Sequence, residues 1–133
     1  MPVIGFAFNS FEGTREKTKA SGEIKVNSTP SITGVKELAL PNFKEKALGI
    51  SWEFTTSYEP HIGTLKVTGE VLYMTKDNKP ILARWKKDKT LPDEQSVEVL
   101  NHLFRRCLLK TANMADDLQL PPPLNFPLVK RKG

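Results

Sequence analysis

The chain has 133 residues, of which 38% are hydrophobic and 26% charged, and its formal net charge is +5. We therefore expect one globular domain spanning residues 1–133, and its single cysteine excludes internal disulfides. No run approaches the roughly 18 apolar residues of a membrane span, and the first residues lack the basic-then-apolar pattern of a signal peptide. We expect a cytoplasmic protein with no membrane partner.

The N-terminal part predicts strands joined by a charged loop. Residues 3–11 are rich in isoleucine and phenylalanine and predict a strand, which residues 12–22 follow as the loop. Ile24 and Val26 begin a second strand by their alternation. Residues 1–28 are thus expected to form an N-terminal strand region.

The next segment predicts an extended chain and a connection. Residues 32–40 carry apolar side chains after a proline and predict a further strand with a bulge near Gly34. Residues 41–46 predict a polar crossover, in which Phe43 is an exposed aromatic side chain.

The clearest alternation of apolar and polar residues comes in the middle of the chain. Residues 48–55 and 65–73 alternate with a period of two, and residues 59–61 form the turn between them. After a polar turn at 76–79, residues 81–85 also alternate. These three segments predict an antiparallel meander with one apolar face, and Trp52 and Trp85 fall on its apolar positions.

A long helix is predicted after the meander. Residues 90–119 carry apolar side chains at spacings of three and four. Thr90 is the expected N-cap, Pro92 suits the first turn, and the prolines at 121–123 are expected to stop the helix. The predicted fold is α+β, an antiparallel sheet of about four to six strands followed by one long helix packed on it. The predicted buried stripe of the helix is Val97, Leu100, Phe104, Cys107, Thr111, Met114 and Leu118.

The tail after this helix is both proline-rich and apolar. Residues 120–133 include Leu120, Leu124 and Phe126, and a solvated polyproline segment would not need such side chains. We expect the tail to lie along a surface, either of its own domain or of a partner.

The positive charge is confined to the second half of the chain. Residues 1–75 hold eight basic and eight acidic side chains, whereas residues 76–133 hold twelve basic and seven acidic ones, a difference of +5. Such an excess binds phosphate backbones or simply keeps a surface solvated. The main cluster is Arg84, Lys86, Lys87 and Lys89.

Nothing in the sequence predicts an enzyme. His61, His102 and Cys107 are too few and too scattered for a zinc site, and Cys107 suits a buried structural thiol. Asp116 and Asp117 are adjacent, so on a helix they point in different directions and do not pair as acid and base. We expect no catalytic residue, no metal and no cofactor.

Two motifs are similar to SecB, the bacterial protein-export chaperone. Cys107 in the helix is followed by Leu120, Pro123, Asn125 and Phe126, which resemble a cysteine and a leucine–proline–asparagine–phenylalanine signature of that family. Residues 32–41, ITGVKELALP, resemble the first strand of the family. The resemblance covers about residues 32–126 in architecture, and no counterpart is found for residues 1–28.

The resemblance implies a non-enzymatic chaperone that binds hydrophobic segments of unfolded or nascent polypeptide and assembles as a homodimer or homotetramer. A partnership with the SecA motor is not supported, because the family docks it through an acidic surface and this chain is basic. The chain also ends soon after Phe126, where the family has a second helix. The alternative interpretation is a nucleic-acid-associated module using the basic cluster. The expected polypeptide-binding residues are Phe43, Leu120, Leu124 and Phe126.

Overall fold

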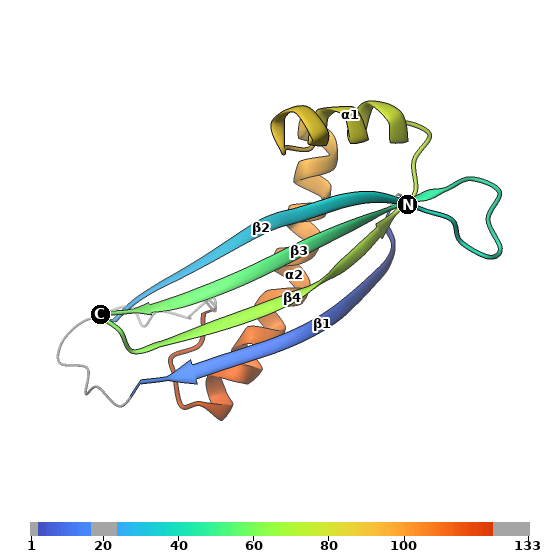
Figure 1. The fold of residues 1–133 in the computed structure, drawn as a ribbon. Coiled ribbons are helices and arrows are strands. Elements are labelled where there is room, and N and C mark those ends of the chain that lie inside the picture. The colour runs from blue at the N-terminus through green and yellow to red at the C-terminus, as the bar shows by residue number, and fades with distance from the viewer. Residues whose placement is uncertain (1–2, 17–23, 124–133) are drawn as a thin grey trace, which may run out of the picture.

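The computed structural model describes residues 3–16 and 24–123. These residues form a four-stranded antiparallel sheet in the order β1-β4-β3-β2 and two helices. Figure 1 shows α2 running obliquely across one face of the sheet, with α1 beside β2. The predicted α+β fold with one long helix on the sheet is confirmed. The elements are β1 (Val3–Arg15), β2 (Lys25–Leu38), β3 (Ala47–Glu59), β4 (Gly63–Tyr73), α1 (Asn78–Asp88) and α2 (Asp93–Asp117).

The two central strands, β3 and β4, are the segments whose alternation was clearest in the sequence. One residue in two is buried from Ile50 to Tyr58 in β3 and from Leu65 to Tyr73 in β4, and the first four residues of β3 are all buried. The strands pair in antiparallel register, with Trp52 opposite Gly69. Both are flanked by other strands and covered on one face, which explains the strict period of two.

The edge strand β2 replaces the two strands expected between residues 24 and 40. The chain stays paired with β3 from Lys25 to Leu38, and the pairing shifts between Ile32 and Gly34, so the bulge predicted near Gly34 is confirmed. Pro30 is tolerated inside the strand because an edge strand has a free hydrogen-bonding side.

Two loop predictions change with this arrangement. The crossover predicted at residues 41–46 is wrong, because β2 and β3 are antiparallel neighbours and the segment merely connects them. The charged loop predicted at residues 12–22 begins later, since β1 continues to Arg15. Residues 17–23 lie outside the described residues.

The strand predicted at residues 81–85 is wrong, because these residues belong to α1. Ile81 and Trp85 are four residues apart, so the same apolar positions also lie on one face of a helix. Ile81 is 1% exposed and joins the core cluster that contains Leu103 of α2. Both helices therefore cover the same face of the sheet.

The buried face of α2 is rotated from the predicted stripe. Its fully buried residues are four apart, a row that winds slowly around the helix and suits an oblique crossing of a twisted sheet. Only Cys107 and Thr111 of the predicted stripe belong to this row, whereas Val97 is 59% exposed. The buried row is Val99, Leu103, Cys107, Thr111 and Ala115.

Both ends of α2 differ from the prediction. Pro92 rather than Thr90 occupies the N-cap, and no side chain caps the first turn. The helix ends at Asp117, before the prolines, because Gln119 adopts a left-handed conformation with φ 57°. The Leu120 N–H donates to the carbonyl of Ala115 at 2.8 Å, which is the long bond of a Schellman motif.

The core lies between the sheet and α2. Trp52 is 1% exposed and Cys107 is fully buried, and burial raises the pKa of the Cys107 thiol to about 12. The expected structural role of Cys107 is thus confirmed, whereas Trp85 is only half-buried. Neither α1 nor α2 combines the length and the apolar character needed to cross a bilayer.

Candidate functional site

A groove opens where β2 meets the two helices, and we call it the β2 groove. It has a volume of about 270 Å³, which is enough for one or two apolar side chains. Its floor and walls come from β2 and, more than 50 residues later in the sequence, from the two consecutive helices, so only the folded chain assembles it. The lining residues are Pro30, Ser31 and Ile32 from β2, Trp85, Lys89, Thr90 and Leu91 from α1 and the following connection, and Ser96 and Leu100 from α2.

The end of α1 shapes this groove. Lys89 is left-handed, with φ 56°, and its backbone N–H donates to the carbonyl of Trp85 at 2.8 Å. This turn brings Thr90 and Leu91 back beside the indole of Trp85, and Leu91 is buried in the core. The groove is therefore held by the core on one side and is open to solvent on the other.

Basic side chains form the rim of the groove. The ammonium of Lys89 lies 5.7 Å from the centroid of the Trp85 ring, a cation–π contact. The guanidinium of Arg84 donates from Nε to Thr90 Oγ1 at 3.4 Å. Within residues 3–16 and 24–123, no ion pair joins either cation to a carboxylate, so both remain available to an anionic partner.

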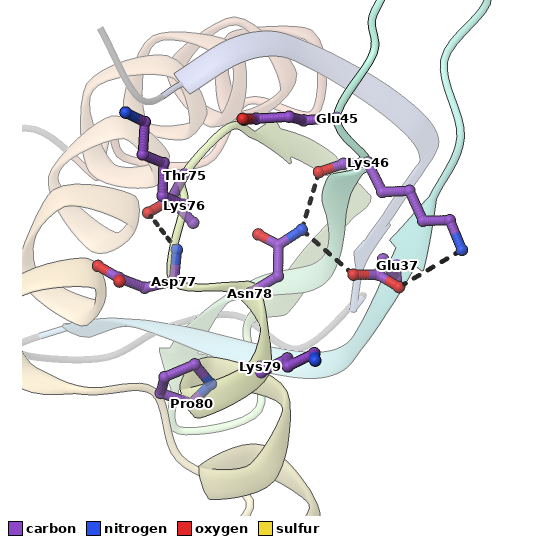
Figure 2. Close-up of a pocket in the computed structure, with 9 residues that line it drawn as sticks. All are labelled: Glu37, Glu45, Lys46, Thr75, Lys76, Asp77, Asn78, Lys79 and Pro80. Carbon is purple, nitrogen blue, oxygen red and sulfur yellow. Dashed lines mark hydrogen bonds and ion pairs between the residues drawn. The ribbon is translucent and has the colours of Figure 1, made fainter.

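A second and larger hollow, of about 590 Å³, lies at the opposite end of α1 (Figure 2). The Asn78 amide donates to the Lys46 carbonyl at 2.8 Å and to Glu37 Oε2 at 3.3 Å. The Lys46 ammonium lies 3.8 Å from the other oxygen of Glu37. These contacts hold the start of α1 against the β2–β3 connection, so we assign them a structural role.

The opposite edge of the sheet carries a row of aromatic side chains, which we call the β1 ladder and define as Phe6, Phe8 and Phe11. Phe6 stacks on Trp52 with ring centroids 5.2 Å apart, whereas Phe11 is 48% exposed. Arg106 lies 4.7 Å from the Phe6 ring and Lys110 lies 4.8 Å from the Phe11 ring. The β1 edge is thus apolar and basic at once.

The structure separates the residues that the sequence grouped as polypeptide-binding. Phe43 is 52% exposed on the β2–β3 connection, at one end of the sheet. Leu120 is 6% exposed at the other end, where it packs with Tyr58 and the hydroxyl of Tyr58 donates to the Pro121 carbonyl at 2.6 Å. The remaining candidates, Leu124 and Phe126, lie outside the described residues.

The four residues of the predicted basic cluster lie exposed at the end of α1 rather than after a strand. Sequence reasoning found these cations but missed the groove beside them. Its apolar wall includes Trp85 and Leu100, which had been assigned to the core. The spacing of Ile81 and Trp85 was the available signal, because it fits a helix that buries one residue and leaves the other half-exposed.

The described residues offer little chemistry for catalysis. Among them no group of three or more histidine, cysteine, aspartate or glutamate side chains is placed to hold a metal ion. His102 lies on α2, where burial and then the nearby Arg105 and Arg106 lower its pKa. The hydroxyl of Tyr73 donates to Glu98 at 2.5 Å, a contact that fixes α2 on β4.

Comparison with known proteins gives a result at the level of the fold. No protein-family model and no curated protein sequence matches the chain. The structure is similar to that of Rv1957, a SecB-like chaperone of Mycobacterium tuberculosis solved in complex with a ChAD peptide from the Rv1956 HigA1 antitoxin. The TM-score is 0.54 at 13% identity, over 98% of this chain and 91% of that one. This chain therefore has a SecB-like fold.

Proposed function

We propose that this protein binds hydrophobic segments of non-native polypeptide and catalyses no reaction. The observation that carries the proposal is the β2 groove, a hollow with both apolar and polar walls beside an edge strand of a SecB-like fold. The similar mycobacterial chaperone was solved with a bound peptide, which supports a polypeptide ligand for the shared fold.

The groove suits an extended segment. Trp85 and Leu100 offer apolar surface, and each apolar side chain that a client buries there gains about 1.5–3 kcal/mol. The neighbouring edge of β2 offers free backbone groups to an added strand. Because α1 has 11 residues and rises about 1.5 Å per residue, a client of about five extended residues would span the length of this helix.

We also propose that the protein works as a homodimer or homotetramer. The β1 edge is an unpaired strand edge with the exposed Ile4 and Phe11, and α2 exposes Leu109. Apolar side chains this large on an edge strand and a neighbouring helix are typical of surfaces that another chain covers.

Binding of a permanently unfolded, fluorescently labelled model protein tests the function. Trp85→Ala should weaken binding about tenfold, because it removes the largest apolar wall of the groove. Val97→Ala is the matched control, since Val97 is exposed on α2 outside the groove. Equal affinity of both variants and the unchanged protein would place the binding surface elsewhere.

The exposed cations of α1 favour one alternative, a nucleic-acid-associated module. RNA binding through Arg84 and its neighbours would fall steeply with salt, because each phosphate contact releases counterions. Binding of an apolar client should depend less on salt and show a negative heat-capacity change. Calorimetry with an unfolded protein and with random RNA separates the two, and tight salt-sensitive RNA binding without client binding would favour the alternative.

A further inference from the structure

We propose that the β2 groove selects apolar segments flanked by acidic residues. This inference rests on the proposed polypeptide-binding function and adds a chemical preference to it. The groove combines apolar side chains, among them Ile32, Trp85 and Leu100, with two cations at its rim. Lys89 lines the groove, and Arg84 is hydrogen-bonded to the lining residue Thr90. A segment that fits both parts carries its carboxylates immediately beside its apolar side chains.

The rim cations contact residues that line the groove. The Lys89 ammonium lies 5.7 Å from the centroid of the Trp85 ring, and Arg84 Nε donates a long hydrogen bond of 3.4 Å to Thr90 Oγ1. Neither cation has a carboxylate partner within the described part of the chain. A client carboxylate would therefore meet two positive charges without displacing an existing ion pair.

The acidic residues close by in sequence do not cancel this charge. Asp93 and Glu94 occupy the first turn of α2, where the positive end of the helix dipole attracts them. Asp88 is exposed at the end of α1. Four basic residues thus stand against one acidic residue between positions 84 and 89.

Charge also argues against other occupants of the groove. Residues 124–133 of the chain itself carry Lys130, Arg131 and Lys132 next to their apolar residues, and like charges disfavour this tail at the basic rim. A nucleic acid would satisfy the cations but would leave the apolar side chains of Ile32 and Leu100 without an apolar partner.

Fluorescence anisotropy with three labelled peptides tests the preference. Each peptide has the same core of leucine and phenylalanine, flanked on both sides by three aspartates, three serines or three lysines. We expect the aspartate peptide to bind about tenfold tighter than the serine peptide at low salt and the lysine peptide to bind weakest. At about 0.3 M salt the differences should shrink, because the rim is exposed.

Two double variants test whether Arg84 and Lys89 cause the preference for acidic flanks. The double substitution Arg84→Glu with Lys89→Glu should invert the order of the three peptides. The matched control is Lys25→Glu with Lys36→Glu, which changes the same charge on exposed positions of β2 outside the groove lining and should keep the order. Thermal melts of both double variants establish that they fold.

The outcomes separate this inference from the function on which it rests. Filling the groove with Ser96→Phe should weaken all three peptides, and binding that ignores this change would overturn the proposed site. If Ser96→Phe blocks binding but the three peptides bind equally, or the lysine peptide binds tightest, the acidic preference is wrong and polypeptide binding stands. An order that survives reversal of Arg84 and Lys89 would also overturn the preference.

Discussion

The two edge strands of the sheet, β1 and β2, differ in how far they are open to pairing with another chain. Edge strands expose unpaired backbone groups and invite another strand. At β2 the pairing of another strand is limited, because Pro30 and the bulge before Gly34 interrupt the edge and α1 lies beside it. At β1 the pairing with β4 also shifts, before Gly5 and before Ser10, but no proline interrupts the strand, and its aromatic rings contact side chains of α2.

This difference favours separate functions for the β1 edge and the β2 edge. A narrow, partly blocked edge with a hollow of defined volume suits short segments that bind and leave. A long open edge with exposed Phe11 suits a large and lasting contact with another chain. The proposal therefore assigns client binding to the β2 edge and assembly to the β1 edge, and the following experiments can break that assignment.

The largest expected effect separates the two tryptophans. Trp52→Ala should lower the free energy of unfolding by about 3–5 kcal/mol, because Trp52 is 1% exposed and supports Phe6 and Phe8. Trp85→Ala should cost only about 1 kcal/mol, since the side chain is half-buried. Urea melts measure both.

A conservative change at the same site refines this test. Trp52→Phe should cost clearly less than Trp52→Ala, because the buried indole N–H has no hydrogen-bond partner in the described structure and its loss removes no bond. Equal losses for Trp85→Ala and Trp52→Ala would mean that the groove wall is part of the core.

The next effect concerns assembly at the β1 edge. We expect light scattering at about 100 µM to give two or four times the chain mass of 15.0 kDa. Phe11→Lys should weaken self-association at least about tenfold, because it replaces an exposed aromatic ring by a charge beside Lys110. The control Phe43→Lys changes an equally exposed ring away from this edge, and a 15.0 kDa mass for the unchanged protein would contradict the assignment.

A smaller effect lies at the end of α2, which touches both edge strands. Burial raises the pKa of Tyr58 to about 12 from 10.0, so the native state favours the neutral phenol. Its contribution to stability is complete below pH 10 and is lost as the pH rises from 10 to 12. Tyr58→Phe should make stability fall less steeply in this window, and it should cost about 1 kcal/mol at pH 7 through the lost bond to Pro121.

Denaturant melts at several pH values measure this change. The thiol of Cys107 and the phenol of Tyr73 also have raised pKa values, so the slope should decrease without vanishing. An unchanged slope would show that Tyr58 is not shielded by the segment after α2.

The smallest expected effect is a gain in stability. Gln119→Gly should stabilise the fold by about 0.5–1 kcal/mol, because a left-handed residue is strained unless it is glycine. Gln119→Ala is the control and should not stabilise. If glycine destabilises as well, the Schellman turn that joins α2 to Leu120 does not hold in solution.

The sequence predicted the fold well where one physical signal acted alone. β3 and β4 are central and covered on one face, so their alternation fixed both elements. The α1 segment was misread because Ile81, Ala83 and Trp85 fit a period of two and also place Ile81 and Trp85 one helical turn apart. Residues 24–40 were predicted as two strands separated at Pro30, although they form the single strand β2. The sequence does not show that this strand lies at an edge of the sheet, where a proline is tolerated.

The candidate site was predictable only in part. The basic cluster was visible as composition, but the hollow beside Trp85 depends on the left-handed turn at Lys89, where no glycine marks it. Phe43 and Leu120 were grouped because both are apolar residues outside regular elements. Their separation follows from the antiparallel path of β3, whose 13 residues extend over roughly 40 Å.

The buried thiol of Cys107 gives this chain a built-in reporter. The thiolate is the form that attacks a thiol-specific reagent, and in the folded state Cys107 is both inaccessible and held protonated by its raised pKa. Since the chain has no other cysteine, the rate of labelling measures how often α2 lifts from the sheet. A client or a second copy that binds only the state in which α2 is packed on the sheet should lower the labelling rate of Cys107. No label then has to be placed near β1 or β2.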